Sequence, residues 1–97
     1  MYIYVIKTRY TPNISRFKVF KETLKLYKVN INSCTSIIGR KLYGSQFYKS
    51  DKNVFTSFVE AKNEVIKRLN SKIAQYENDI EEAKNDIELI ENLLERE

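Results

Sequence analysis

The sequence contains no histidine and no tryptophan, and only one cysteine, one proline and two glycines occur among its 97 residues. Without histidine, the commonest general base is missing, and a nucleophilic serine or cysteine has no imidazole to activate it. One cysteine forms no intrachain disulfide and is too few for the Cys/His clusters that hold transition metals. These absences argue against an enzyme and against a bound metal or other cofactor.

Long hydrophobic runs are also missing. The longest apolar run falls far short of the roughly 20 residues that a membrane-spanning helix requires. The first six residues are followed at once by Lys7 and Arg9, so they do not form the apolar core of about 7 to 15 residues that a secretory signal needs. We therefore expect a cytoplasmic protein without a membrane partner.

Charge is distributed very unevenly along the chain. Residues 1–53 contain eleven Lys or Arg and two acids, Glu22 and Asp51, for a net charge of +9. Residues 54–97 contain six Lys or Arg and eleven acids, for a net charge of −5. Eleven of the twelve aromatic residues lie in residues 1–58. The composition predicts two parts, which we call the basic head (residues 1–56) and the acidic tail (residues 57–97).

The first part of the head has the alternation of a β-strand. Between Tyr2 and Tyr10, one set of alternate residues is aromatic or β-branched, and the other runs from Ile3 and Val5 to Lys7 and Arg9. Thr11, Pro12 and Asn13 then predict a turn.

Residues 16–31 fit two structures. Phe17, Phe20, Leu24, Tyr27 and Ile31 follow a helical spacing, but apolar and basic residues also alternate, and the aromatic and β-branched content favours a strand. A bulge near Phe20 would absorb the change of phase. We therefore predict one long bulged strand, or two abutting strands, over this segment.

The remainder of the head gives weaker signals. Residues 30–36 read as a polar loop, residues 37–38 and 41–43 as short strands around Gly39, residues 44–53 as a loop, and residues 54–56 as a last strand. Together these segments predict a small antiparallel sheet of three to five strands followed by one long helix, an α+β fold.

The tail begins with a capping box, Ser57-Phe58-Val59-Glu60, and contains no glycine or proline from there to Arg96. Apolar residues then repeat every seven positions, the pattern of a coiled coil, with Lys62 as the one polar exception. The a positions are Val59, Ile66, Ile73, Ile80, Ile87 and Leu94, and the d positions are Lys62, Leu69, Tyr76, Ala83 and Ile90.

A helix of this length is longer than a small sheet can cover, so its far half needs another partner. The same stripe on a second copy is the leading candidate. The alternatives are a helical hairpin that turns near residues 70–71 and a helix of another protein. The expected oligomerisation residues are Ile66, Leu69, Ile73, Tyr76, Ile80, Ala83, Ile87, Ile90 and Leu94.

The remaining functional signal is the basic, aromatic character of the head. Cations that pair with phosphates and rings that stack on bases are typical of single-strand binding proteins, although the same residues suit an acidic protein surface or a solvated sheet face. The candidate partner or nucleic-acid binding residues are Lys7, Arg9, Arg16, Lys18, Lys25, Lys28, Arg40, Lys41, Tyr43 and Tyr48.

One resemblance spans most of the chain. A strand, the segment 16–29, Gly39-Arg40-Lys41, and then Val54-Phe55-Thr56-Ser57 leading into a helix with Glu60-Ala61 resembles small phage and prophage-type proteins. The resemblance implies a non-enzymatic accessory protein of a bacterial host cytoplasm, one that binds and inhibits or modulates a host or defence factor. It assigns no functional residues.

Overall fold

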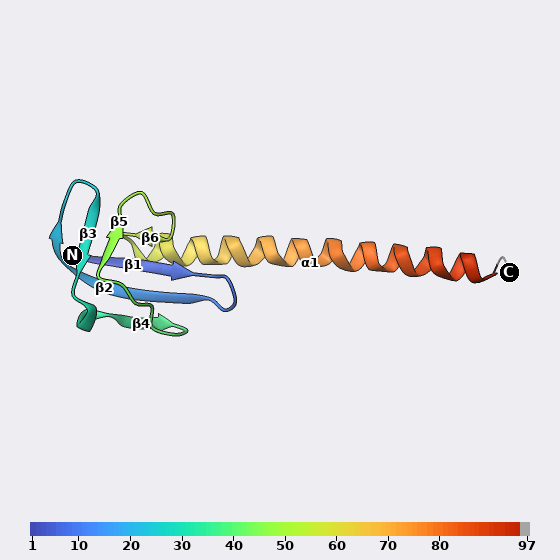
Figure 1. The fold of residues 1–97 in the computed structure, drawn as a ribbon, viewed down its shortest axis with the longest axis horizontal. Helices are drawn as coiled ribbons and strands as arrows, with labels where there is room; N and C mark the ends of the chain where they lie inside the picture. Colours follow the sequence, from blue (N-terminus) through green and yellow to red (C-terminus); the bar gives the residue numbers. More distant parts are fainter. Residues whose placement is uncertain (96–97) are drawn as a thin grey trace. The chain divides into compact units, whose positions relative to one another are not determined.

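The computed structural model describes residues 1–95, and the side chains of residues 1–93. It contains an antiparallel sheet followed by one long helix, so the predicted α+β class is confirmed (Figure 1). The elements are, in chain order, β1 (Tyr2–Lys7), β2 (Asn13–Glu22), β3 (Leu26–Val29), the 3-10 helix η1 (Ile31–Ser33), β4 (Thr35–Ile38), β5 (Gln46–Tyr48), β6 (Val54–Phe55) and α1 (Phe58–Glu95).

The sheet is organised around β2. Its strand order is β5-β3-β2-β1-β6, and β4 also pairs with β2. β1 lies along one edge of β2, from Tyr2 opposite Lys18 to Lys7 opposite Asn13. On the other edge, β4 pairs with the first half of β2 and β3 with the second half. The described residues thus form six strands, where three to five were expected.

The segment 16–31 is strand rather than helix, as predicted. Its two strands, β2 and β3, are joined by a short turn, and their register shifts between Val19 and Lys21. This shift is the bulge expected near Phe20. Val19, just before the shift, packs against the core, whereas Phe20 at the shift is exposed.

The core lies on one face of the sheet. Its buried residues are Ile3, Val5, Phe17 and Val29, and the ring of Phe47 packs on Phe17 at a centroid distance of 5.0 Å. Val54, Leu42 and Cys34 are among the partly buried residues around this cluster. The segment after β4 therefore folds back over the sheet and closes the core.

The opposite face of β1 is covered by the first turns of α1. The Oγ of Ser57 accepts a hydrogen bond from the backbone N–H of Glu60 at 3.4 Å, as the capping box predicts. The Phe58 ring packs against Tyr4 at 5.8 Å, and Ala61 and Val65 are buried. Because side chains alternate along a strand, Tyr4 and Ile6 face the helix while Ile3 and Val5 face the core. Both faces of β1 are therefore buried.

The structure corrects four predictions in the head. The predicted loop at 30–36 contains η1 and the first two residues of β4. β1 ends at Lys7 and does not continue to Tyr10. Residues 41–43 form no strand, and the N–H of Leu42 in this segment donates to the side chain of Ser15 in β2 rather than to a strand backbone. The predicted loop at 44–53 contains β5, which pairs with β3 through Phe47 opposite Tyr27. Three residues between polar neighbours are too few for alternation to reveal a strand.

The chain divides into two compact units, Met1–Lys67 and Arg68–Glu97. The first contains the sheet and the beginning of α1, and the second contains the remainder of the helix. The change from strand to helix falls between Phe55 and Phe58.

Candidate binding surfaces

The ten residues predicted to bind a partner do not form one patch. Lys7, Arg40, Lys41 and Tyr43 line a single cleft, whereas the other six lie elsewhere on the head. Arg9 sits in the turn after β1, with its guanidinium 5.2 Å from the ring of Tyr10. Arg16 stacks on Tyr2 at 4.6 Å, so its side chain covers the sheet rather than reaching outward. The other members of this second group are Lys18 on β2, Lys25 in the β2–β3 turn, Lys28 on β3 and Tyr48 on β5.

The cleft, which we call the basic cleft, has a volume of about 770 Å³. It lies between the end of β1, the turn that follows, and the segment after Gly39. Its walls are formed by Val5, Ile6, Lys7, Tyr10, Thr11, Asn13, Arg40, Lys41, Leu42, Tyr43, Phe47, Asp51 and Asn53.

One wall of the basic cleft is held by side-chain hydrogen bonds to the backbone. The Oδ1 of Asn13 accepts from the N–H of Arg40 at 2.7 Å, and the Oγ of Ser15 accepts from the N–H of Leu42 at 3.0 Å. The Sγ of Cys34 donates to the carbonyl oxygen of Leu42 at 3.3 Å. These bonds take the place of a strand ladder, so residues 40–42 are fixed although they form no strand.

Gly39 makes the approach to this wall possible. Its φ of +75° lies in the left-handed region, which side chains disfavour. A Cβ atom at this position would also lie 2.2 Å from the Oδ1 of Asn13 and 2.6 Å from the carbonyl oxygen of Pro12. Any larger residue would push the segment away from the side chain of Asn13, which holds it.

The side chains at the mouth of the basic cleft are cationic and aromatic. Lys7, Arg40 and Lys41 are exposed, and the rings of Tyr10 and Tyr43 are 80% and 84% exposed. The one acid among its lining residues is Asp51, whose Oδ1 already accepts from the N–H of Asn53 at 2.8 Å. The cleft therefore combines positive charge with two largely exposed tyrosine rings, one of which, Tyr10, has the guanidinium of Arg9 over it.

Sequence reasoning missed the residues that build the cleft. Asn13 and Ser15 are buried polar residues on the same face of β2 as the core residue Phe17. The sequence does contain a signal for them, since polar side chains at inward positions of a strand are buried and need hydrogen-bond partners from elsewhere in the chain. Cys34, which the sequence analysis assigned to no site, donates a hydrogen bond to the carbonyl oxygen of Leu42.

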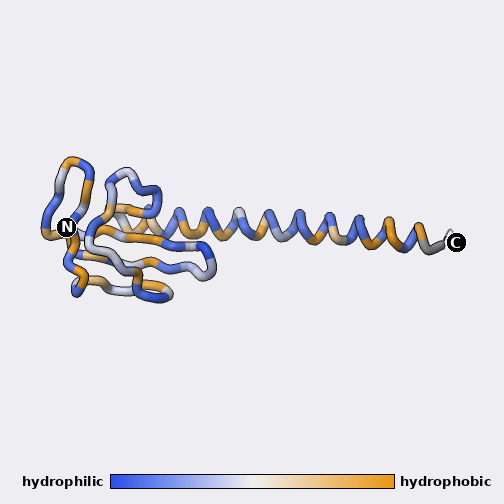
Figure 2. Tube along the Cα trace, viewed as in Figure 1, coloured by the Kyte–Doolittle hydropathy of each residue, from blue (hydrophilic) through white to orange (hydrophobic). Residues whose placement is uncertain are grey.

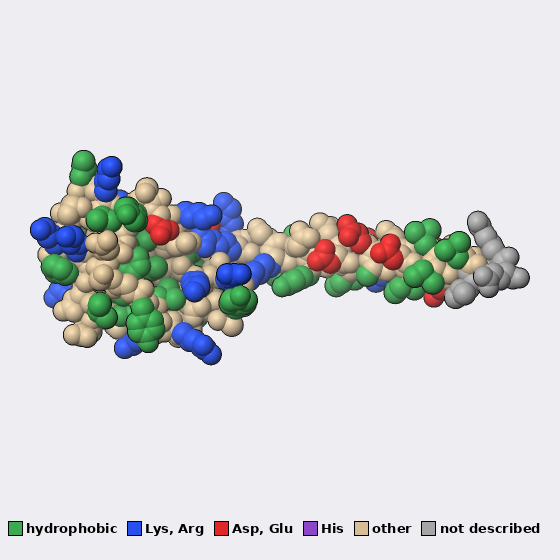
Figure 3. All heavy atoms as spheres, viewed as in Figure 1, with side chains coloured by type: hydrophobic (Ala, Val, Ile, Leu, Met, Phe, Trp, Pro, Cys, Tyr) green, Lys and Arg blue, Asp and Glu red, His purple; other side chains and the backbone are tan. Residues whose placement is uncertain are grey.

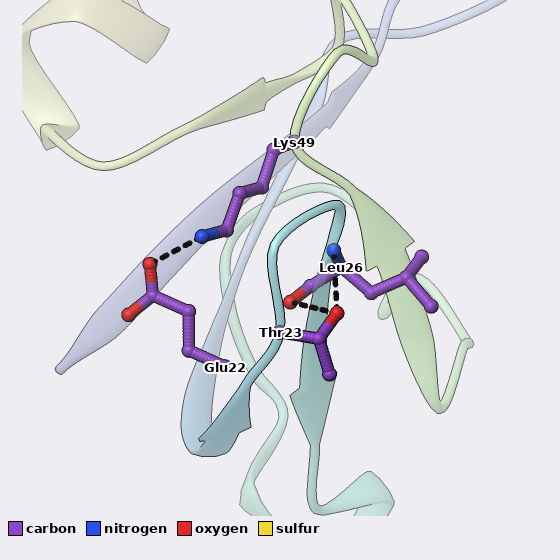
Figure 4. Close-up of polar contacts among 4 residues, drawn as sticks. All are labelled: Glu22, Thr23, Leu26 and Lys49. Carbon is purple, nitrogen blue, oxygen red and sulfur yellow. Dashed lines mark hydrogen bonds and ion pairs between the residues drawn. The ribbon is translucent and has the colours of Figure 1, made fainter.

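A second surface surrounds the β2–β3 turn, shown in Figure 4. The N–H of Leu26 donates to the Oγ1 of Thr23 at 3.0 Å, which fixes the turn. The Nζ of Lys49 contacts the Oε1 of Glu22 at 2.6 Å and lies 5.3 Å from the ring of Tyr27. Leu24, at the tip, is 90% exposed.

An open hollow of about 560 Å³ lies on the same hairpin. We call it the apolar hollow, since Phe20 and Ile31, both more than half exposed, contribute its large side chains. Its remaining lining residues are Val29, Asn30, Asn32 and Ser45. Lys18 adjoins it, because its carbonyl oxygen accepts from the N–H of Asn30.

Most of the predicted heptad stripe is exposed in the described part of α1, Ala83 included, whereas Leu69 is half-buried. In the first unit, Val59 and Ile66 are exposed although their neighbours Ala61 and Val65 are buried, so the face that covers the sheet is not the stripe. In the second unit, Ile73, Tyr76, Ile80, Ile87 and Ile90 are each between 55% and 62% exposed. Figure 2 shows hydrophobic positions recurring along one side of the helix trace, and Figure 3 shows hydrophobic side chains along that side for much of its length. Leu94 lies outside the residues whose side chains are described.

Chemistry-bearing clusters are scarce in this structure. Among the described residues, no group of three or more His, Cys, Asp or Glu is placed to hold a metal ion. Within the same residues, no helix combines the length and the apolar character needed to cross a membrane.

Comparisons with known proteins add no family to these observations. Neither the protein-family models nor the curated proteins nor the solved structures contained a significant match to the chain.

Proposed function

We propose that the chain is a non-enzymatic, self-associating binding module in which the heptad stripe of α1 pairs with the stripe of a second copy. The observation that carries this proposal is the separation of two helix faces. Ala61 and Val65 are buried in the first unit, whereas Ile66 and the apolar residues that follow at heptad spacing stay exposed. Exposed isoleucines repeated every seven residues have the spacing that knobs-into-holes packing requires.

The charges beside the stripe support a second copy as the occupant. Lys72 and Asp79 occupy g positions, and Glu77 and Lys84 occupy the e positions five residues further along. In a parallel, in-register pair of helices, each g residue faces the e residue of the partner five positions later. Lys72 then faces Glu77 and Asp79 faces Lys84, so the chain is complementary to itself over these two heptads.

We propose that the head binds a partner protein. The partner would present an acidic surface and insert an apolar side chain into the apolar hollow. Phe20 and Ile31 offer the apolar contact, and the exposed Lys18 is joined through its carbonyl oxygen to the lining residue Asn30. The resemblance to phage proteins suggests a host or defence factor of the bacterial cytoplasm as this partner, which the module would inhibit or modulate. Two heads on one assembly would raise the apparent affinity for a multivalent partner.

Light scattering during size-exclusion chromatography tests the self-association. We expect a mass of at least twice 11.5 kDa at micromolar concentration. The double variant Ile73→Asp/Ile80→Asp places charges in the proposed interface and should be a monomer, because burying unpaired carboxylates costs several kcal/mol. The control Asn78→Asp/Asn85→Asp adds the same charge on the opposite helix face and should keep the wild-type mass. A wild-type monomer at every concentration contradicts the proposal.

Affinity capture from a bacterial lysate tests whether a partner binds through the apolar hollow. The wild-type protein is compared with two variants. A partner bound through the apolar hollow should be lost from Phe20→Ser/Ile31→Ser and retained by Leu24→Ser, which removes an exposed apolar side chain outside the hollow. Equal retention by both variants would mean that the partner binds elsewhere.

A further inference from the structure

We infer that the basic cleft is a binding site for single-stranded nucleic acid, with its cations on the phosphates and its exposed tyrosine rings stacked on bases. This site is separate from the helix stripe and from the apolar hollow, so the inference goes beyond the proposed function and does not depend on it.

The cations of the cleft are brought together by the fold. Lys7 ends β1, whereas Arg40 and Lys41 follow β4, more than thirty positions later in the sequence. The bond from the N–H of Arg40 to Asn13 joins these segments, because Asn13 pairs with Lys7 across the β1–β2 ladder. Three positive side chains consequently line one cleft, and Asp51 is its single acidic lining residue.

The cleft wall is held in place before any ligand arrives. The backbone at Arg40 and Leu42 is tied to Asn13 and Ser15, both of which are buried in β2. The N–H of Ile6 donates to the carbonyl oxygen of Asn53 at 2.9 Å, which anchors another part of the lining to β1. A ligand therefore has only side chains to order, and preorganisation of this kind reduces the entropy lost on binding.

The two tyrosines favour nucleic acid over other anions. A phosphate ion or an acidic peptide needs the cations but makes no use of exposed ring faces. Tyr10 and Tyr43 line the cleft beside the cations, and both rings are largely exposed. Alternating phosphates and bases match such a mixture, since base stacking on aromatic side chains is the usual mode of single-strand recognition.

The same two rings favour a single strand over a double-stranded nucleic acid at this site. Bases in a double helix are already stacked, so their faces are closed to a side chain, and groove reading usually uses an inserted helix or β-ribbon. No described helix borders the cleft, whose walls are strand ends and loops. RNA and DNA single strands share the chemistry used here, and the 2′-hydroxyl is the feature that separates them.

Fluorescence anisotropy of the full-length protein tests the inference with labelled oligo-uridine, oligo-thymidine, a DNA duplex and poly-glutamate. Single strands should bind best. Three phosphate contacts predict a slope of about −2 in log affinity against log salt, so affinity should fall about 20-fold from 50 to 200 mM salt. A difference between the uridine and thymidine probes would report contact with the 2′-hydroxyl.

Charge-matched variants locate the site. Arg40→Ala/Lys41→Ala should lower single-strand affinity at least tenfold and reduce the salt slope to about −0.7, because one cation is left. Lys25→Ala/Lys28→Ala removes the same charge away from the cleft and should retain most of the affinity. Tyr43→Ala should lower affinity at least fivefold, whereas Tyr48→Ala, which removes an exposed ring outside the cleft, should have little effect.

Four results would overturn the inference. They are no binding of either single strand at 50 mM salt, equal losses in the two charge-matched pairs, duplex binding as tight as single-strand binding, and tighter binding of poly-glutamate. Ile73→Asp/Ile80→Asp should still bind a short single strand, so failure of self-association and failure of this site are separable outcomes.

Discussion

The basic head and the second unit are stabilised in different ways. In the head, residues distant in the sequence hold one another, as when Asn13 bonds to Arg40 or when Phe17 packs on Phe47. In the second unit, the side chain of Gln75 donates a hydrogen bond to the Oδ1 of Asp79 at 3.1 Å, one helical turn further along. The head is stabilised by packing between distant segments, whereas a helix in a protein gains most of its stability when its apolar face packs against a partner. The two regions should therefore respond to different substitutions.

The largest expected effect is loss of the core of the head. Phe17→Ala should lower the free energy of unfolding by about 3–5 kcal/mol, because Phe17 is fully buried and its removal leaves a cavity. Phe20→Ala, the same substitution three positions later on the exposed surface, should change it by less than about 0.5 kcal/mol. Urea unfolding followed by tyrosine fluorescence measures both. Similar losses in the two variants would mean that β2 does not bury Phe17.

A smaller effect is expected at the turn that leads into the cleft wall. Gly39→Ala should destabilise the head by about 1–3 kcal/mol, since it forces a left-handed φ on alanine and brings a Cβ atom against Asn13. Adding Asn13→Ala removes the Cβ contact with the Asn13 side chain, although the contact with the Pro12 carbonyl oxygen stays. The double variant should therefore lose less stability than the sum of the two single losses. Additive losses in thermal unfolding would show that the Cβ contact is unimportant.

The next smaller loss of stability is expected when the Ser15 hydroxyl, which accepts from the N–H of Leu42, is removed. Ser15→Ala should cost about 1–2 kcal/mol, because the N–H of Leu42 loses its acceptor inside the head. Ser50→Ala, at an exposed serine, is the matched control and should be silent. Chemical denaturation gives both values, and NMR spectra should place the shift changes of Ser15→Ala around residues 40–42. Changes confined to β2 would contradict this role.

The junction between sheet and helix should be less sensitive. Ser57→Ala removes the acceptor of the Glu60 N–H and should lower stability by about 1 kcal/mol. Ser57→Asp retains an acceptor and should restore the loss. Far-ultraviolet circular dichroism during thermal unfolding measures the effect, and equal stability of all three proteins would exclude a capping role.

The smallest effect is expected for the surface ion pair between Glu22 and Lys49. Glu22→Gln should cost less than about 1 kcal/mol, because both side chains are partly exposed and water screens their attraction. The difference from wild type should shrink further at high salt. A loss comparable with that of Phe17→Ala would contradict this assignment of the pair to the surface.

The parts of the fold that could be predicted have a repeating signal. Alternation revealed β1, the phase change at Phe20 revealed the bulge, and Ser57 and Glu60 revealed the start of α1. The path of residues 40–42 had no such signal, because it is set by side chains of β2 that lie far away in the sequence. For the same reason, the basic residues could be named from composition, but which of them share a cleft could not.

The distance in sequence between the partners of the cleft wall also bears on folding kinetics. The bonds from Asn13 to Arg40 and from Ser15 to Leu42 each span 27 residues, whereas β1 and β2 form a hairpin across a short turn. Closing a longer loop costs more chain entropy, and local contacts form earlier. The hairpin is therefore expected to fold first and the cleft wall to dock late. In native-state hydrogen exchange, the amides of Arg40 and Leu42 should then open at a lower free energy than those of β1, so the cleft can be lost and regained while the hairpin stays folded.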